Sequence, residues 1–178
     1  NQSKNIGGTM MIGIIGAMEQ EVSQIVAAMT DVAVSEIAGM KFNKGKFCNK
    51  EVIVVKSGIG KVNAAICAEI LVACFNVDKI INTGIAGSLK NEINIGDVVL
   101  STDALQHDVD ATNFGYAKGV IPGMAVSTFI ADEGLIKTAE EACHKACPDI
   151  EVFKGRVVSG DIFVSDKAVK NSIAETFH

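Results

Sequence analysis

The chain has 178 residues, of which 48% are hydrophobic and 21% charged, and this balance suits one or two folded domains and excludes a disordered chain. Its 16 Lys and Arg against 21 Asp and Glu give a net charge of -5, so no basic surface for nucleic acid or anionic lipid is expected. No apolar run approaches the roughly 18 residues of a membrane span, and the polar residues 1–10 do not resemble a secretion signal, so we expect a cytoplasmic protein.

The chain opens with a strand that passes directly into a helix. Met11 to Ile15 is a short apolar run ended by Gly16, which is typical of a buried strand. From Ala17 on, apolar side chains recur at helical spacing as far as Met29. This succession is how an α/β domain begins.

The rest of the chain continues the alternation of strands and helices. Residues 41–47 alternate around Asn-Lys-Gly and predict a hairpin turn. The remaining expected elements are strands at residues 51–56, 79–82, 97–101 and 155–159, and helices at about 61–74, at 132–147 and from near 165. Residues 106–125 form an irregular segment, and a loop of that length inside a compact domain is usually functional. The pattern predicts one α/β domain.

Glycines follow three of the predicted strands directly. They are Gly58 and Gly60, Gly84 and Gly87, and Gly160. Any one of them is explained by a tight turn. In open α/β sheets, however, ligands bind beyond the carboxyl ends of the strands, where loops bring backbone N–H groups close to a small molecule. Three such loops favour a small-molecule site.

The familiar cofactor and metal motifs are incomplete. Asn63 stands where a dinucleotide fingerprint needs its third glycine, and Val62 stands where a phosphate-binding loop needs Ser or Thr. Residues 143–147 (CHKAC) lack the second cluster that a four-ligand zinc site requires. Residues 107–110 (HDVD) offer ligands for a hard metal, but short acidic loops are mostly turns or caps. We expect neither a metal nor a cofactor.

Two acids open the first helix, and either is a candidate for proton transfer. Glu19 and Glu21 border the apolar stripe of the helix on opposite sides. Both are also explained as ordinary first-turn acids favoured by the helix dipole. A catalytic role requires one of them to lie buried beside a substrate. The helical pattern does not choose between them.

Five motifs occur in order and at appropriate separations. They are residues 13–22 (GIIGAMEQEV), 57–62 (SGIGKV), 82–87 (NTGIAG), 107–110 (HDVD) and 159–163 (SGDIF). With these motifs the chain closely resembles the bacterial 5'-methylthioadenosine/S-adenosylhomocysteine nucleosidases, which have the nucleoside phosphorylase type I fold. The resemblance implies a three-layer α/β/α domain with a central mixed sheet over residues 11–178. Residues 1–10 are then a short native extension or a remnant of expression.

The resemblance also implies the activity and its residues. The family hydrolyses the N-glycosidic bond of its two substrates, releasing adenine and the thioribose. Glu21 matches the general base that draws a proton from water, and Phe163 matches the ring that stacks on adenine. Ala86 and Gly87 match the loop at the ribose and base, and Val164 matches the residue whose backbone reads the base edge. Met18 and Ile59 match pocket residues near the ribose and the 5'-substituent. Phe114 and Pro122 match residues that complete the 5'-thio pocket of a neighbouring subunit, which implies a homodimer.

Water is the expected nucleophile. A phosphorylase needs a cationic cradle for phosphate, usually with Arg, and the single arginine, Arg156, lies within a predicted strand. The alternatives are a related purine nucleoside phosphorylase, a nucleosidase for aminodeoxyfutalosine, and a nucleoside-binding module without catalysis. Assays with and without phosphate, and replacement of Glu21 by Gln, distinguish these classes.

Two departures from the family pattern stand out. Ile85 occupies a position where some relatives carry a hydroxyl group. The family also continues beyond His178 with a Glu that binds the ribose hydroxyls and an Asp that protonates adenine, so the domain is expected to lack its C-terminal part. Without that proton donor, we expect the 178 residues alone to turn over negligibly, with a loss of about 10²–10⁴-fold from this group.

Overall fold

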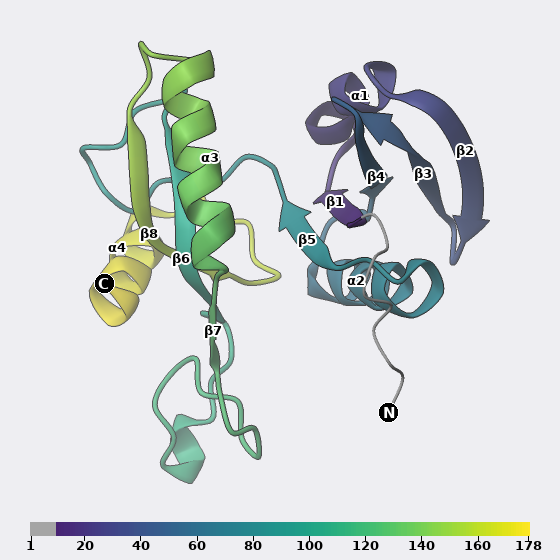
Figure 1. Cartoon of the computed structure of the whole chain (residues 1–178). Coiled ribbons are helices and arrows are strands. Elements are labelled where there is room, and N and C mark those ends of the chain that lie inside the picture. The colour runs from purple at the N-terminus through teal and green to yellow at the C-terminus, as the bar shows by residue number, and fades with distance from the viewer. Residues whose placement is uncertain (1–9) are drawn as a thin grey trace. The chain divides into compact units, whose positions relative to one another are not determined.

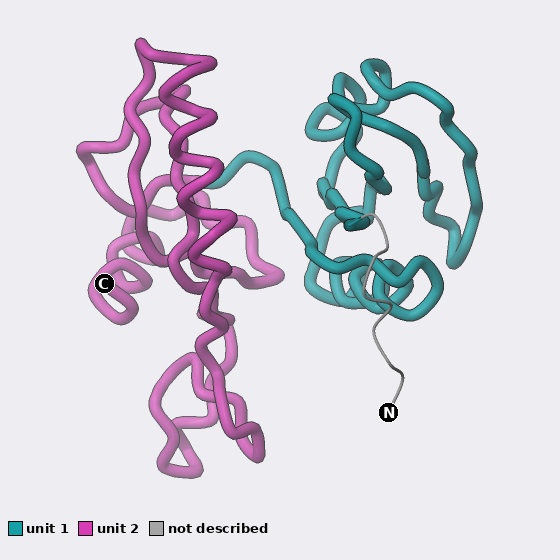
Figure 2. The backbone as a smooth tube through the Cα atoms, in the orientation of Figure 1, with its two compact units in different colours: residues 1–86 teal, residues 87–178 magenta. Residues whose placement is uncertain are grey.

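The computed structural model describes residues 10–178, so the predicted extension at residues 1–10 lies outside the described residues, apart from Met10. The chain forms two compact units that divide between Ala86 and Gly87 (Figure 2). Each unit is built around a sheet of its own. Each is therefore described by itself below.

Unit 1 is a mixed sheet with two helices. In chain order it contains β1 (Ile12–Gly16), α1 (Glu19–Ala27), β2 (Thr30–Ile37), β3 (Met40–Phe47), β4 (Lys50–Lys56), α2 (Lys61–Phe75) and β5 (Lys79–Asn82) (Figure 1). The strand order is β2-β3-β4-β1-β5. β1 is parallel to β4 and β5, whereas β3 is antiparallel to β2 and β4. The strand–helix opening predicted from the sequence is thus present as β1 and α1.

Both faces of this sheet are covered by helices. Successive side chains of a strand point to opposite faces, so one strand can contribute to two hydrophobic clusters. One hydrophobic cluster packs α2 against the sheet: Ile15, Met40, Phe42, Ile53, Val55, Cys67 and Leu71. The other packs α1 against it: Ile14, Val22, Met29, Val52 and Val54. The near-continuous apolar run of β4 supplies both clusters, as expected for a strand buried on its two faces. Unit 1 therefore has the helix–sheet–helix layering that the resemblance implies.

Cys67 of α2 is fully buried in the first cluster, and burial raises the pKa of its thiol to about 11. A pKa above the pH keeps the thiol protonated, and only the thiolate reacts with alkylating reagents. We expect iodoacetamide at about pH 8 to leave Cys67 unmodified in the native protein while it labels the exposed Cys48, Cys74 and Cys147. Peptide mass spectrometry measures each site. Labelling of Cys67 as fast as Cys74 without denaturant would contradict this packing.

The prediction of a hairpin turn within residues 41–47 is wrong. These residues form a continuous strand, β3. The turns lie on either side of it. In the first, Ala38 and Gly39 have φ of 51° and 75°, and in the second, Cys48 and Asn49 have φ of 47° and 59°. Two-residue turns with both φ values positive match the twist of antiparallel strands. The Asn-Lys-Gly sequence therefore marks the middle of a strand, and β2, the edge strand, was not predicted.

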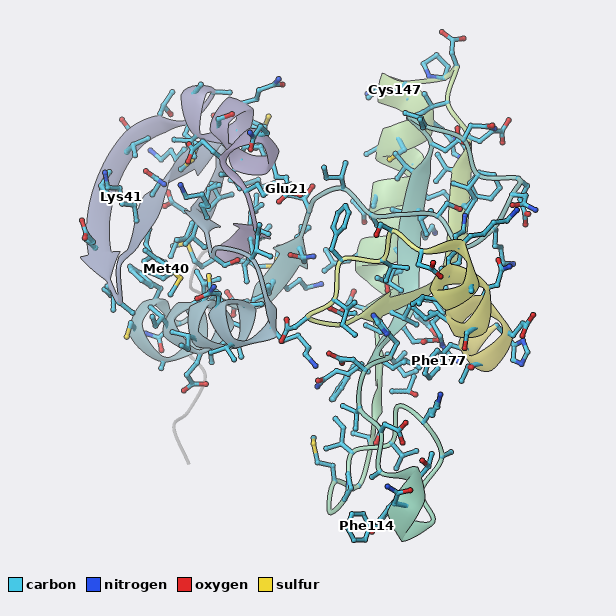
Figure 3. The ribbon with its side chains drawn as sticks, turned by 180° about the vertical axis from the view of Figure 1, so that it is seen from behind. Glu21, Met40, Lys41, Phe114, Cys147 and Phe177 are labelled. Atoms are coloured by element: carbon cyan, nitrogen blue, oxygen red, sulfur yellow. The ribbon has the colours of Figure 1, made fainter. Side chains whose placement is uncertain are left out.

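Unit 2 is a smaller sheet with a helix on each face (Figures 1 and 3). It contains β6 (Val98–Gln106), the short helix η1 (Thr112–Phe114), β7 (Thr128–Ile130), α3 (Glu133–Ala146), β8 (Val152–Ser159) and α4 (Lys167–Phe177). The strand order is β7-β6-β8, with β6 parallel to β8 and antiparallel to β7. Ile173 and Phe177 of α4 pack on Leu105 of β6. This cluster fixes α4 to the sheet.

The α/β class with mixed sheets is confirmed, and the strands are divided between two sheets, one in each unit. Both late helices begin where their capping residues stand, at Asp132 and Asp166, whose carboxylates accept backbone N–H bonds of the first turn. In the described part of the chain, no helix has the length and apolar character needed to cross a membrane.

Candidate active site

Three loops of unit 1 leave the sheet at the same edge. β4, β1 and β5 are parallel neighbours, so their carboxyl ends coincide. Backbone bonds continue the pairing one residue further, from Ser57 N to Gly16 O at 2.9 Å and from Thr83 N to Ile15 O at 2.9 Å. The glycine-containing loops after the three strands are therefore neighbours, as expected for a ligand-binding edge.

Glu21 joins two of these loops. It lies half-buried in the first turn of α1 (Figure 3). Its Oε2 accepts a hydrogen bond from Met18 N at 2.9 Å, and its Oε1 accepts one from Ile85 N at 3.0 Å. A single carboxylate thus bonds to the loop after β1 and to the loop after β5. Such bonds fix the position of the group and leave further lone pairs on both oxygens for a proton or a water molecule.

Two glycines make this placement of Glu21 possible. A Cβ atom on Gly84 would lie 2.5 Å from Glu21 Oε1 and 2.8 Å from its Cδ. A Cβ atom on Gly16 would lie 2.6 Å from Val22 Cγ1 and 3.0 Å from Glu21 Cβ. Both approaches are closer than any side chain tolerates. Gly16, the last residue of β1, and Gly84, after β5, therefore provide room for Glu21, a function that a turn alone does not require.

The structure also distinguishes the two acids of the first turn. Glu19 is exposed and forms an ion pair with Lys56, with Oε2 2.9 Å from Nζ. Glu21 instead points toward the loops. The bonding partner Ile85 was not identified from the sequence as such, because what it contributes is a backbone N–H. The nearby Gly84 was the visible signal.

The loop after β4 presents an apolar side chain. Ser57 is buried, and its hydroxyl donates to Gly58 O at 2.8 Å. Gly58 and Gly60 have φ of 87° and 101°, so this turn requires glycine at both positions. Between them Ile59 is 74% exposed. Unit 1 thus carries Glu21, Met18, Ile59 and Ala86 on the loops of one sheet edge.

In unit 2, two loops also leave the sheet at the same edge. β6 and β8 end side by side, with Gln106 opposite Ser159. Val164, after β8, is half-buried against the cluster of Leu105, Ile173 and Phe177. Phe163, by contrast, is 93% exposed. The ring that is predicted to stack on adenine is therefore exposed to solvent, whereas the next residue, Val164, is anchored.

Phe114 and Pro122 lie on the long segment between β6 and β7. Phe114 ends η1, is 84% exposed and lies at the tip of the loop that this segment forms (Figure 3). Pro122 is also exposed. Gly87 is exposed as well, at the start of unit 2, next to Ala86 of unit 1 in the chain. The predicted residues thus fall into three groups: those on the loops at the edge of the unit 1 sheet, with Gly87 following them in the chain, those after β8, and those on the long segment.

Neither segment considered for a metal forms a metal-binding cluster. Over residues 10–178, no three or more His, Cys, Asp or Glu residues are grouped so as to hold a metal ion. Residues 143–147 lie at the end of α3, where Cys147 N donates to Cys143 O at 2.8 Å. In the HDVD segment, Asp108 bonds to the loop after β8 and Asp110 to Thr112. The carboxylates of this segment hold backbone in place.

Comparison with known proteins gives one family. The family model for the phosphorylase superfamily matches residues 11–178. A 5'-methylthioadenosine/S-adenosylhomocysteine nucleosidase of Bacillus thuringiensis is 44% identical over 168 residues, which cover 94% of this chain and 72% of the relative.

Solved structures agree with this result. The nucleosidase of the same name from Colwellia psychrerythraea, in complex with adenine, has a TM-score of 0.90 and 35% identity, over 96% of this chain and 70% of the other. A futalosine hydrolase mutant from Helicobacter pylori has a TM-score of 0.88 and 33% identity, over 95% of this chain and 76% of the other. The chain belongs to the phosphorylase superfamily and, within it, to the 5'-methylthioadenosine/S-adenosylhomocysteine nucleosidase family.

Proposed function

We propose that the protein hydrolyses the N-glycosidic bond of 5'-methylthioadenosine and S-adenosylhomocysteine, releasing adenine and the 5-thioribose product. The observation that carries this proposal is the placement of Glu21, whose carboxylate is held by the N–H groups of Met18 and Ile85 at 2.9 and 3.0 Å. Relatives bear the name of this activity, and one of them was solved with adenine bound.

The proposed chemistry follows from the charge that develops on the sugar. Glycosidic cleavage passes through a ribose with oxocarbenium character, so a nearby carboxylate stabilises the transition state. Glu21 also takes a proton from the attacking water, whose oxygen bonds to the anomeric carbon as the bond from that carbon to adenine N9 breaks. The electron pair of the broken bond stays on adenine, which takes up a proton from solvent water. Its two backbone hydrogen bonds restrict its motion, so little reorganisation is needed at the moment of reaction.

The proposed substrate contacts are mostly apolar. Phe163 stacks on adenine and the Val164 backbone reads the edge of the base, while Ala86 and Gly87 lie at the ribose and base. Met18 and Ile59 contact the ribose and 5'-substituent. The high exposure of Phe163 and Ile59 supports this, because exposed apolar side chains on loops at a sheet edge are typical of a binding surface. A thioether nucleoside carries no charge on its base or sulfur, so it suits such a surface.

We propose water as the nucleophile, since the single arginine is already engaged. Arg156 Nε lies 2.6 Å from Asp103 Oδ1, and a second nitrogen of Arg156 donates to Phe177 O at 3.0 Å. Asp103 raises the pKa of Arg156, mainly through this hydrogen bond. The guanidinium thus joins β8 to β6 and to the end of α4. It therefore supports a structural role for Arg156 in place of a phosphate cradle.

We further propose a homodimer in the cytoplasm, in which Phe114 and Pro122 complete the 5'-thio pocket of a second copy. The long segment supports this, since it also exposes Tyr116, Met124 and Val126, and several exposed apolar side chains on one segment are typical of an interaction surface. Light scattering should give about twice the 18.7 kDa of one chain. A single-chain mass at micromolar concentration would contradict the dimer.

Adenine release tests the activity. Chromatography under single-turnover conditions, with enzyme in excess, keeps slow reactions visible. We expect release from 5'-methylthioadenosine at the same rate with and without phosphate. A reaction that stops without phosphate would indicate a phosphorylase, and binding without any release would indicate a nucleoside-binding module. The assay also tests aminodeoxyfutalosine as a second substrate, because the futalosine hydrolase mutant from Helicobacter pylori has a TM-score of 0.88 with this chain.

A further inference from the structure

We propose that Asp108 is a positioning residue for adenine binding: its carboxylate holds the loop after β8 so that Phe163 and Val164 meet the base. The proposal rests on the proposed function, which assigns those two residues to adenine. It concerns the HDVD segment, residues 107–110, which the proposed chemistry does not use. Asp108 itself makes no contact with substrate in this proposal.

The two segments meet because their strands are parallel neighbours. The HDVD segment begins directly after β6, and the adenine loop, residues 160–165, begins directly after β8. His107 N donates to Ser159 O at 2.9 Å. One step further, Asp161 N donates to Asp108 Oδ2 at 3.0 Å. A charged acceptor makes this the stronger kind of hydrogen bond, so the carboxylate fixes the loop where it leaves the sheet.

Gly160 shows how close the contact is. A Cβ atom there would lie 2.5 Å from His107 Nε2, 2.7 Å from its Cε1 and 3.0 Å from Asp108 Cγ. Only glycine lets the chain pass at this distance. The glycine after β8 thus resembles Gly84 after β5: each leaves room for a side chain that bonds to the residue following the glycine.

The loop is held at its other end as well. Val164 packs against the cluster of Leu105, Ile173 and Phe177, and Ser165 N donates to Phe163 O at 3.1 Å. Phe163 lies between the two anchors with 93% of its surface exposed. A ring with so little packing of its own takes its position from the backbone. The hydrogen bond of Asp108 is therefore expected to determine where the ring stands.

The first test is the affinity for adenine, measured by isothermal titration calorimetry. Asp108→Ala is expected to raise Kd about tenfold, the typical effect of one lost hydrogen bond that leaves a donor unpaired. Asp108→Asn keeps an acceptor oxygen and should recover most of the affinity. The matched control is Asp110→Ala, which removes a carboxylate from the same segment that bonds to Thr112; it should change Kd less than about twofold.

A double-mutant cycle separates positioning from a general effect on folding. If Asp108 acts through the ring, Asp108→Ala should add less than about twofold to the loss caused by Phe163→Ala. Gly160→Ala is the second variant, should Asp108→Ala fail to fold: its Cβ would displace the loop, so Kd should rise at least tenfold. Gly155→Ala, on β8 with open space around its Cβ position, is its control and should have little effect.

The outcomes distinguish this proposal from the proposed function. If the unchanged protein does not bind adenine, the proposed function fails. If it binds adenine and the folded Asp108→Ala and Gly160→Ala variants bind equally well, the positioning role is overturned. Losses from Asp108→Ala and Phe163→Ala that simply add would also overturn it, because the two side chains would then act independently.

Discussion

Replacing Glu21 by glutamine is expected to lower the rate of adenine release by about 10²–10⁴-fold, the usual contribution of a general base. Glutamine has nearly the same shape, but its amide does not take a proton from water and carries no charge to stabilise the sugar cation. It also has only one acceptor oxygen for the two N–H groups that Glu21 binds. Kd for 5'-methylthioadenosine should therefore rise, by about tenfold at most.

Glu19→Gln is the matched control. Glu19 lies two residues away on the same helix turn, and its partner is Lys56 at the surface. Exposed ion pairs contribute little, so the rate should change less than about twofold. The two rates are compared under single-turnover conditions, with circular dichroism to confirm folding. Equal activity of Glu21→Gln and the unchanged protein would exclude Glu21 as the base, and with it the proposed mechanism.

Elements whose pattern is local were predicted well. The apolar run of β1, the helical spacing of α1 and the bounds of β5 follow from their own residues. Elements set by a partner were not. β6 extends to Gln106, well past the predicted end at residue 101, because β8 pairs with it along that length. The edge strand β2 and the turns beside β3 likewise depend on strand pairing, which a short sequence window does not contain.

The same distinction holds for the site. Glycines at the carboxyl ends of strands predicted which loops form the candidate site, since glycine positions can be read directly from the sequence. The helical pattern did not distinguish Glu19 from Glu21, and only the family resemblance did, because the deciding group is the N–H of Ile85, 64 residues away from Glu21. The bond from Asp161 to Asp108 spans 53 residues and was missed for the same reason. Such contacts exist only once the strands are assembled.

Gly84→Ala is expected to lower the rate of adenine release at least about 10²-fold with little change in stability. The new Cβ would lie 2.5 Å from Glu21 Oε1, so the flexible carboxylate must turn away and lose its bond to Ile85. A displacement of about 1 Å in an active site costs this much in rate. The backbone of Gly84 is outside the left-handed region, so alanine adds no backbone strain, and Tm should stay within a few degrees of the unchanged protein.

The double variant identifies the cause of that loss. If Gly84→Ala acts by moving Glu21, it should add nothing to Glu21→Gln, because the displaced group has already lost its function. Gly155→Ala, where nothing lies within 4 Å of the new Cβ, controls for the added methyl group. Additive losses would mean that Gly84 affects the reaction independently of the carboxylate, for example through contact with the substrate. A fully active Gly84→Ala would mean that catalysis does not depend on Glu21 being held where the two N–H groups place it.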